Sequence, residues 1–421
     1  MRPVDAKYKY DKMMTMSIND LNGRLTAVDL FCGCGGISVG LRSAGFEVLA
    51  GVDINKKYIC SFEKNFPNAQ VITDDITTIP PSEFMERLGL KVGELTLLAG
   101  GPPCQGFSKN VPRKYRFLED DKNQLIRTYL DYCEALQPKM ILMENVAEMR
   151  NGFDQAYTQE LEQRLAQAGY SLHHAVLTAA DYGVPQRRRR AFFLATRLGF
   201  KFGSPKVTHL PLNQGPVMGL FEDKQHVTVW EAIGDLPPLK HGDSPEVVEY
   251  TAPPQNEFQE KMRNGLISVS DHIARKLAAT QFARLNSLEP GQGLKDLPLE
   301  LQTKGGFSGA YGRLTKEMIA PTITRWVFHP GSGRWGHPVD IRTLSIREIA
   351  RIQSFPDSFT FVGSFNDQSG QLGNAVPPML AETVATHMLR EARNQTAATK
   401  SKPQLAAKFK PQILPALEST I

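Results

Sequence analysis

Short apolar runs alternate with helix-like stretches over residues 25–199, and few folds can accommodate this alternation. The strand-like runs lie at residues 27–31, 48–54, 70–73, 96–99, 140–143, 174–178 and 190–195. Between them, residues 37–44, 125–136 and 159–168 have the periodicity of helices. Strands that alternate with helices predict a doubly wound, mostly parallel α/β sheet with helices on both faces. Such sheets bind their ligands at the carboxyl ends of the strands, so we expect the site at that edge.

A glycine-rich turn, Phe31-Cys-Gly-Cys-Gly-Gly36, follows the first predicted strand and opens the first predicted helix. Its glycines let the backbone approach a ligand closely. About twenty residues after Gly33, Asp53 ends the second strand, where an acid can accept hydrogen bonds from ribose hydroxyls. The Gly-x-Gly-Gly spacing argues against a nicotinamide oxidoreductase and favours a compact nucleoside cofactor such as S-adenosylmethionine. A turn without any ligand remains the alternative.

A second unusual segment, Gly-Gly-Pro-Pro-Cys-Gln-Gly-Phe-Ser, occupies residues 100–108. Pro102 and Pro103 have fixed φ and no amide donor, so they stop the strand predicted before them. Cys104 therefore lies on a loop just past a strand end, a position suited to a nucleophile. The alternative is that Cys104 is one more buried core cysteine.

Composition narrows the class of protein. The chain has 421 residues, 41 % hydrophobic and 22 % charged, as in ordinary globular proteins, and its net charge of +5 is compatible with a polyanionic partner. Five cysteines without framework spacing indicate a reducing compartment, and Cys32 and Cys34 lack the second ligand pair of a metal site. No signal-like segment and no long apolar run is present. We expect a cytoplasmic protein with no metal and no membrane contact.

Taken in order, these segments resemble the C5-cytosine DNA methyltransferase family. The blocks that carry the resemblance are Asp29-Leu-Phe-x-Gly-x-Gly-Gly36, Asp53, Asp75-Ile76, Gly101-Pro-Pro-Cys-Gln-Gly-Phe-Ser108, Glu144-Asn-Val146, Gln186-Arg-Arg-Arg-Arg190, Arg342-Thr-Leu-Ser-Ile-Arg-Glu348, Arg351-Ile-Gln-Ser-Phe-Pro356 and Gln371-Leu-Gly-Asn-Ala-Val376. They cover residues 26–196 and 337–390. The resemblance implies a class I methyltransferase fold, Rossmann-like, with S-adenosylmethionine as methyl donor and double-stranded DNA as substrate.

The resemblance also assigns site residues. The catalytic residues it implies are Cys104, Glu144, Arg188 and Arg190. The cofactor contacts it implies are Phe31, Gly33, Gly35, Gly36, Asp53, Ile54, Asp75, Ile76, Pro103, Leu125 and Asn374. Three departures from the family pattern stand out: Asp53 where Glu is common, Ala375 where Ser is common, and four arginines where two are needed. None of them removes a catalytic group.

The resemblance implies methylation of cytosine at C5, and C5 is a poor nucleophile until a thiolate adds at C6. Cys104 would make that addition, while Glu144 would donate to N3 from a pocket that raises its pKa. Arg188 or Arg190 would bind O2 and the adjacent phosphate. The competing interpretations are a surface or ion-paired Glu144 and a solvated basic face for the arginines. By resemblance, the target base is flipped out of the duplex and the basic segment 108–121 closes over it, although an ordinary surface loop remains open.

Residues 200–330 lose the alternation, and only residues 322–327 look like a strand. We expect five segments: an extension (1–24), the catalytic and cofactor-binding domain (25–199), a smaller, irregular target-recognition domain (200–336), a return to the catalytic domain (337–392) and a flexible basic tail (393–421). For residues 200–336, the alternative is a structural linker. We expect a monomer, and a companion restriction endonuclease sharing the DNA site or a solitary or phage role. The alternative functions are tRNA cytosine-5 methylation and DNA binding without catalysis.

Overall fold

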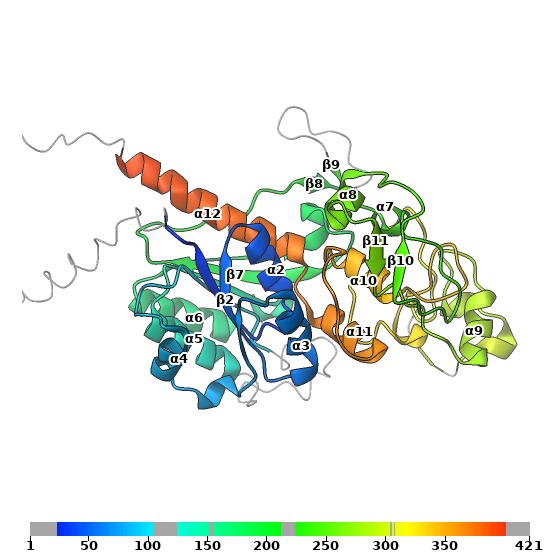
Figure 1. The fold of residues 1–421 in the computed structure, drawn as a ribbon, viewed down its shortest axis with the longest axis horizontal. Helices are drawn as coiled ribbons and strands as arrows, with labels where there is room; N and C mark the ends of the chain where they lie inside the picture. The colour runs from blue at the N-terminus through cyan, green and yellow to red at the C-terminus, as the bar shows by residue number, and fades with distance from the viewer. Residues whose placement is uncertain are drawn as a thin grey trace, which may run out of the picture.

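A seven-stranded sheet forms the centre of the larger part of the molecule (Figure 1). The computed structural model describes residues 23–103, 124–150, 155–211, 224–303, 305–306 and 308–400, with side chains up to residue 395. The strands are β1 (Thr26–Leu30), β2 (Glu47–Val52), β3 (Gln70–Ile72), β4 (Leu97–Gly100), β5 (Met140–Val146), β6 (Ser171–Thr178) and β7 (Arg189–Thr196). Each lies where an apolar run predicted a strand.

The strand order is β3-β2-β1-β4-β5-β7-β6. The first five strands pair in parallel, whereas β7 runs antiparallel to both β5 and β6. The predicted doubly wound, mostly parallel α/β sheet is therefore confirmed. Because β7 is antiparallel, its first residues lie at the same edge as the carboxyl ends of β1, β2, β4 and β5.

Helices cover both faces of the sheet (Figure 1). One face carries α4 (Pro81–Leu88), α5 (Gln124–Leu136) and α6 (Ala156–Gln167), and the other carries α2 (Gly36–Ser43), α3 (Lys56–Asn65) and α12 (Pro378–Lys400). Alternate residues of each strand belong to the two cores: Val28 and Leu98 pack on the first set, and Ala27 and Leu97 on the second. Burial on both faces explains why these strands read as continuous apolar runs.

Two glycines of α2 bring the C-terminal helix back to the sheet. A Cβ at Gly36 would lie 2.3 Å from the carbonyl oxygen of Val376, and one at Gly40 would lie 2.6 Å from that of Pro378. Any other residue would push α12 away from α2. The tail that we expect to be flexible begins at residue 393, and α12 extends into it as far as Lys400. Residues 393–400 contain good helix formers that extend the helix.

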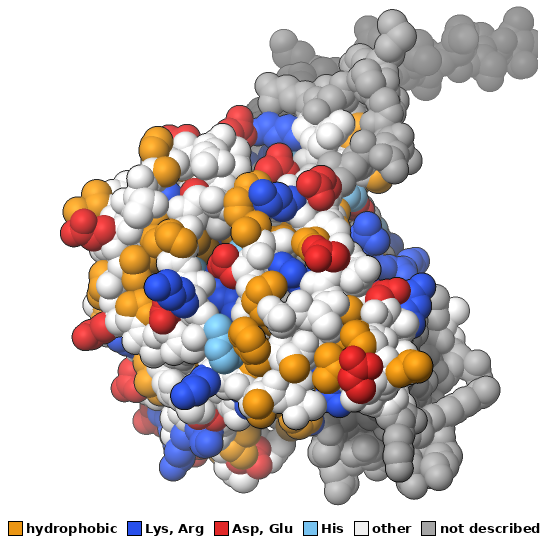
Figure 2. All heavy atoms as spheres, turned by 90° about the vertical axis from the view of Figure 1, so that its right-hand side faces the viewer, with side chains coloured by type: hydrophobic (Ala, Val, Ile, Leu, Met, Phe, Trp, Pro, Cys, Tyr) orange, Lys and Arg blue, Asp and Glu red, His pale blue; other side chains and the backbone are white. Residues whose placement is uncertain are grey.

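The smaller part of the molecule lies beyond the carboxyl edge of the sheet and has short elements (Figure 1). They are β8 (His209–Leu210), β9 (Lys224–Gln225), α7 (Val229–Ile233), β10 (Val247–Glu249), α8 (Glu257–Arg263), β11 (Ser268–Ser270), α9 (Ala279–Asn286), α10 (Ile346–Ile352) and α11 (Phe365–Asn374). On its outer face, positive and negative side chains are interspersed rather than segregated (Figure 2). In the described residues, no helix has both the length and the apolar character needed to cross a membrane.

Buried ion pairs fix α10 inside this smaller part. Arg351 lies 2.6 Å from Asp357 and 3.0 Å from Asp235, and Arg263 lies 2.6 Å from Asp235. The side chains of Arg351, Asp235 and Asp357 are fully buried. These contacts cross the boundary predicted at residues 336 and 337, so the residues on its two sides share one core.

Breaking this network should be strongly destabilising. We expect Arg351→Met to lower the free energy of unfolding by about 3–5 kcal/mol, because two buried carboxylates, Asp235 and Asp357, would each lose a cationic partner. Denaturant titration of the purified protein measures the change. Arg127→Met, which removes an ion pair between exposed side chains (Arg127 to Glu160, 2.8 Å), is the matched control and should change stability little. Equal effects of the two substitutions would contradict the prediction.

Candidate active site

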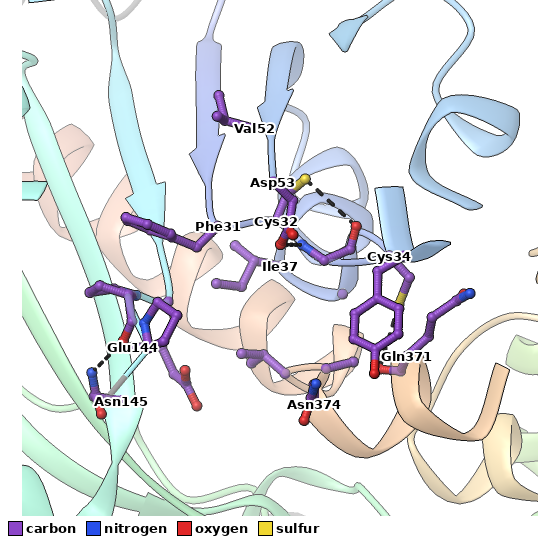
Figure 3. A pocket seen from close by; sticks show the side chains of 18 of the residues that line it. Phe31, Cys32, Cys34, Ile37, Val52, Asp53, Glu144, Asn145, Gln371 and Asn374 are labelled. Atoms are coloured by element: carbon purple, nitrogen blue, oxygen red, sulfur yellow. Dashed lines mark hydrogen bonds between the residues drawn. The ribbon is translucent and has the colours of Figure 1, made fainter. Parts of the chain in front are cut away.

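A cavity of about 490 Å³ opens at the carboxyl edge of the sheet (Figure 3). It gathers residues that are far apart in the sequence, on the loops after β1, β2, β3 and β4, at the ends of β5 and β7, and on α11. The predicted site residues that line it are Phe31, Gly33, Gly36, Asp53, Ile54, Asp75, Ile76, Pro103, Leu125, Glu144, Arg188, Arg190 and Asn374. Gly35 does not line it, because this residue faces the rings of Phe62 and Phe66 instead. Cys104 and the segment 108–121 lie outside the described residues.

The turn after β1 is held in an unusual conformation. Phe31 has a φ of 61° and Gly33 a φ of 56°, both in the left-handed region, which a bulky residue such as phenylalanine rarely adopts. One carboxylate oxygen of Asp53 accepts a hydrogen bond from the Gly33 N–H at 2.8 Å, and the other accepts one from the Asn55 N–H at 2.8 Å. Asp53 therefore connects the turn after β1 to the start of α3.

The chemistry of this half of the cavity fits a nucleoside. Phe31, Ile54 and Leu125 supply apolar walls for a purine, and Ile54 is 64 % exposed despite its apolar side chain. Asp53 and Asp75 supply carboxylates that can accept hydrogen bonds from hydroxyl and amino groups. Burial raises the pKa of Asp53, while the hydrogen bonds from Asn55 and Gly33 oppose the rise. These acceptors and apolar walls thus match a nucleoside better than a phosphorylated ligand, because two carboxylates would repel a phosphate.

The other half of the cavity contains Glu144 and two arginines. Arg190 lies 2.8 Å from the carboxylate of Glu144, and both side chains are largely buried. Burial raises the pKa of Glu144, while the positive charges of Arg190 and Arg188 oppose that rise. Glu144 is therefore ion-paired but faces a cavity, which reconciles the two interpretations left open by the sequence.

Arg188 occupies a different environment from Arg190. Its guanidinium donates to the carbonyl oxygens of Ile323 at 2.9 Å and Gly373 at 3.2 Å, and the residue is only 1 % exposed. Desolvation lowers the pKa of Arg188. Arg188 thus ties the segment at Ile323 and the end of α11 to the cavity wall, whereas Arg190 is the arginine in contact with Glu144.

The charge of Arg190 should show in the pH dependence of the reaction. If Glu144 acts in its protonated form, the active population falls as the pH rises through the pKa of Glu144. Arg190→Gln removes a charge that lowers this pKa, so the decline in rate should move to higher pH. Single-turnover rates at saturating substrates give the pH profile. The control is Arg189→Gln, which changes the exposed residue just before Arg190 in β7. A profile that stays in place or moves to lower pH contradicts the prediction.

Asn145 holds the loop that leads to Cys104. Its side-chain amide donates to the carbonyl oxygen of Pro102 at 2.9 Å, and its amide oxygen accepts from the Val146 N–H at 2.8 Å. A Cβ at Gly101 would lie 3.2 Å from a carboxylate oxygen of Glu144. The residues immediately before Cys104 are therefore placed beside Glu144.

The strand predicted at residues 322–327 is wrong. Side chains, rather than a neighbouring strand, take the backbone groups of Ile323: its N–H donates to Gln186 Oε1 at 2.8 Å, and its carbonyl accepts from Arg188. A turn follows at residues 325–328. This segment lines the cavity through Arg325, and Tyr58 of α3 is a second lining residue that no sequence pattern indicated. In the described residues, no group of three or more His, Cys, Asp or Glu side chains could hold a metal ion.

Comparison with known proteins identifies the family of the chain. The family model for C-5 cytosine-specific DNA methylase matches residues 25–390. The chain is 31 % identical to the Type II methyltransferase M.AgeI of Thalassovita gelatinovora over 86 % of this chain and 98 % of that protein. It is also 31 % identical to M.DdeI of Desulfomicrobium norvegicum, covering 86 % and 88 % of the two chains. A solved structure, described as a DNA modification methyltransferase encoded within an E. coli prophage, superposes with a TM-score of 0.69 at 25 % identity, covering 88 % and 99 %.

The sheet order, the cavity at its carboxyl edge and the structural match define a class I methyltransferase fold. The chain belongs to the C-5 cytosine-specific DNA methylase family, and its activity is methyl transfer to C5 of cytosine in DNA.

Proposed function

We propose that the cavity binds S-adenosylmethionine beside a cytosine flipped out of duplex DNA, and that Cys104 carries the reaction through a covalent bond to C6. The observation that supports this most directly is the Arg190–Glu144 pair, which faces the same cavity as Asp53 and lies next to the loop leading to Cys104. A base-binding half and a nucleoside-binding half thus share one space.

The other cysteines of the site are poorly suited to be nucleophiles. Cys32 and Cys34 line the cavity but are buried, and burial raises the pKa of both thiols well above the usual range. Burial does the same for Cys133, a core residue of α5. A thiol with a raised pKa is rarely a thiolate at neutral pH. This supports Cys104 as the nucleophile.

In the proposed reaction, Cys104, Glu144 and Arg190 act on the cytosine ring. The Cys104 thiolate adds to C6 of cytosine, forming a C–S bond, while Glu144 delivers its proton to N3 and Arg190 donates to O2. S-adenosylmethionine, when bound, supplies an electrophilic methyl group for the electron-rich C5. The C5 proton then leaves to water, the C–S bond breaks to regenerate the thiolate, and the N3 proton returns to Glu144. Every charge that forms on the base has a partner within the cavity.

Asp53 should contribute to donor affinity. We expect Asp53→Ala to weaken binding of S-adenosylmethionine by about 1–3 kcal/mol, because the ribose hydroxyls lose a charged acceptor and the Gly33 turn loses its hydrogen bond. Calorimetry without DNA measures this loss. Asp131→Ala, which removes a carboxylate paired with Arg164 outside the cavity, is the control. Unchanged donor affinity in Asp53→Ala would remove this residue from the site.

The division of labour along the chain is also a proposal. Residues 25–199 and 337–392 supply the cofactor and reaction groups, and residues 200–336 select the DNA sequence through contacts with base edges. Residues 1–24 and 393–421 are an N-terminal extension and a C-terminal tail, to which we assign neither role. The relatives named Type II methyltransferases support a role in restriction–modification beside a companion endonuclease. We propose a monomer acting on cytoplasmic DNA.

The deciding experiment compares nucleic acids and traps the intermediate. Purified protein should transfer labelled methyl groups to duplex DNA and not to tRNA, and bisulfite sequencing of host DNA after expression should reveal the target site. Duplex DNA with 5-fluorocytosine at that site should become covalently attached in the presence of S-adenosylmethionine, because fluorine cannot leave as the proton does. Preferential methylation of tRNA would favour the alternative substrate, and absence of any transfer would favour a non-catalytic DNA-binding protein.

A further inference from the structure

Arg325 lines the cavity but takes no part in the reaction described so far. Two other arginines line it, and both have partners: Arg190 pairs with Glu144, and Arg188 donates to two carbonyl oxygens. Within the described residues, the guanidinium of Arg325 makes no hydrogen bond or ion pair and lies 4.8 Å from the ring centre of Trp326. Arg325 is thus a cation of the cavity wall whose donors are free.

The backbone of Arg325 is fixed against the cavity wall. A Cβ at Gly373 would lie 2.1 Å from the backbone nitrogen of Arg325, so glycine permits a close approach here. Two residues earlier, Ile323 is held through its N–H by Gln186 and through its carbonyl by Arg188. These contacts place Arg325 at the edge of the cavity independently of its own side chain.

Tyr58 supplies a second free donor on the same side of the cavity. It lies in the first turn of α3, and its hydroxyl oxygen approaches α11, where a Cβ at Gly370 would lie 2.5 Å away. The hydroxyl has no hydrogen-bond partner among the described residues. Burial raises the pKa of the Tyr58 phenol, while the charge of Arg325 opposes the rise, so the two groups lie close enough to interact. Tyr58 therefore keeps its proton at neutral pH and can donate it to a hydrogen bond.

We propose that Arg325 and Tyr58 form a subsite for an anionic oxygen at the mouth of the cavity. A guanidinium and a phenol hydroxyl are both donors, and the Trp326 ring keeps the guanidinium plane in place. The inference rests on the proposed function, in which two ligands with anionic oxygens reach this cavity. One belongs to the carboxylate of the amino-acid end of the methyl donor, and the other to a DNA phosphate beside the flipped cytosine. Ala375, another residue that lines the cavity, has no side-chain donor for either group.

Separate binding measurements on Arg325→Ala and Tyr58→Phe test the subsite. Calorimetry with S-adenosylmethionine in the absence of DNA reports the carboxylate. Titration of a duplex oligonucleotide carrying the target site, at several salt concentrations, reports the phosphate. We expect Arg325→Ala to weaken one of the two ligands by about 10-fold or more, and Tyr58→Phe to weaken the same ligand by a smaller factor. If the ligand is the phosphate, the salt slope in Arg325→Ala should also fall by about 0.9.

Arg42 provides a matched control. It is an exposed arginine stacked on an aromatic ring, 4.4 Å from the centre of Phe66, but it lies in the last turn of α2 and does not line the cavity. Arg42→Ala should leave both affinities and the salt slope unchanged. The subsite is refuted if Arg325→Ala and Tyr58→Phe keep wild-type affinity for both ligands, or if Arg42→Ala causes the same losses.

The outcome is separable from that of the proposed function. Wild-type protein that traps 5-fluorocytosine DNA, together with variants that bind both ligands normally, would refute the subsite alone. Wild-type protein that fails to trap the DNA would refute the proposed mechanism. In Arg325→Ala, trapping should persist at saturating donor and DNA, because Cys104 and Glu144 are intact.

Discussion

Glu144→Gln is expected to lower the rate of methyl transfer by about 100-fold to 10,000-fold, the range that positioned acid catalysis contributes. The glutamine side chain keeps an acceptor for Arg190 and a donor for N3, but it has no proton to give as charge develops on the ring. Affinity for S-adenosylmethionine and for DNA should therefore remain within a few-fold of wild type. Single-turnover methyl transfer with labelled donor measures the rate, and equilibrium titrations measure the two affinities.

Glu160→Gln is the appropriate control for this substitution. Glu160 also pairs with an arginine, Arg127, at 2.8 Å, but on α6, away from the cavity. We expect the control to methylate at the wild-type rate. A Glu144→Gln protein that retains more than about one tenth of the wild-type rate would show that the carboxyl group of Glu144 is not the acid of the reaction.

Cys104→Ser is expected to have the larger effect still, with a loss of about 10,000-fold or more in turnover, as for other enzymes that lose their covalent nucleophile. Serine preserves the size of the side chain, but its hydroxyl is far less acidic than a thiol, so almost no alkoxide exists to attack C6. Covalent attachment to 5-fluorocytosine DNA should disappear together with methyl transfer. Non-covalent DNA binding should persist, because the arginines and the recognition segment are unchanged.

Substitution of another cysteine controls for loss of a thiol as such. Cys60 lies on α3, is half-buried and does not line the cavity, so Cys60→Ser should trap 5-fluorocytosine DNA as wild type does. If Cys104→Ser still methylates DNA at a rate near that of wild type, the covalent mechanism is wrong.

The central strands of the sheet could be predicted because they are buried on both faces. Runs such as Met140–Met143 and Ala191–Ala195 carry that burial as continuous apolar sequence, which requires no knowledge of the rest of the chain. The turns that follow them are equally visible, since the φ values of Gly33 and the stop at Pro102 are encoded by residue type. Local sequence was therefore sufficient for the fold and for one edge of the cavity.

The remaining wall of the cavity could not be predicted, because its geometry depends on contacts between distant residues. Thr322–Val327 has the composition of a strand, yet Gln186 and Arg188, more than one hundred residues earlier, take its backbone groups. Tyr58 gave no signal at all, because a tyrosine on an amphipathic helix normally belongs to the core. The different environments of Arg188 and Arg190 also require the fold, since both are alternate residues of one basic run.

The way Arg188 is bonded has a consequence for which parts of the sequence can vary. Its two acceptors, at Ile323 and Gly373, are main-chain carbonyl oxygens, and every amino acid carries one. Side chains between residues 200 and 323 can therefore change without disturbing the hydrogen bonds of Arg188, as long as the backbone returns to the same point at Ile323. Position 373 is the opposite case, because a Cβ there would collide with the Arg325 backbone. Exchange of the whole segment between related enzymes would therefore preserve the hydrogen bond to Ile323, whereas position 373 must remain glycine.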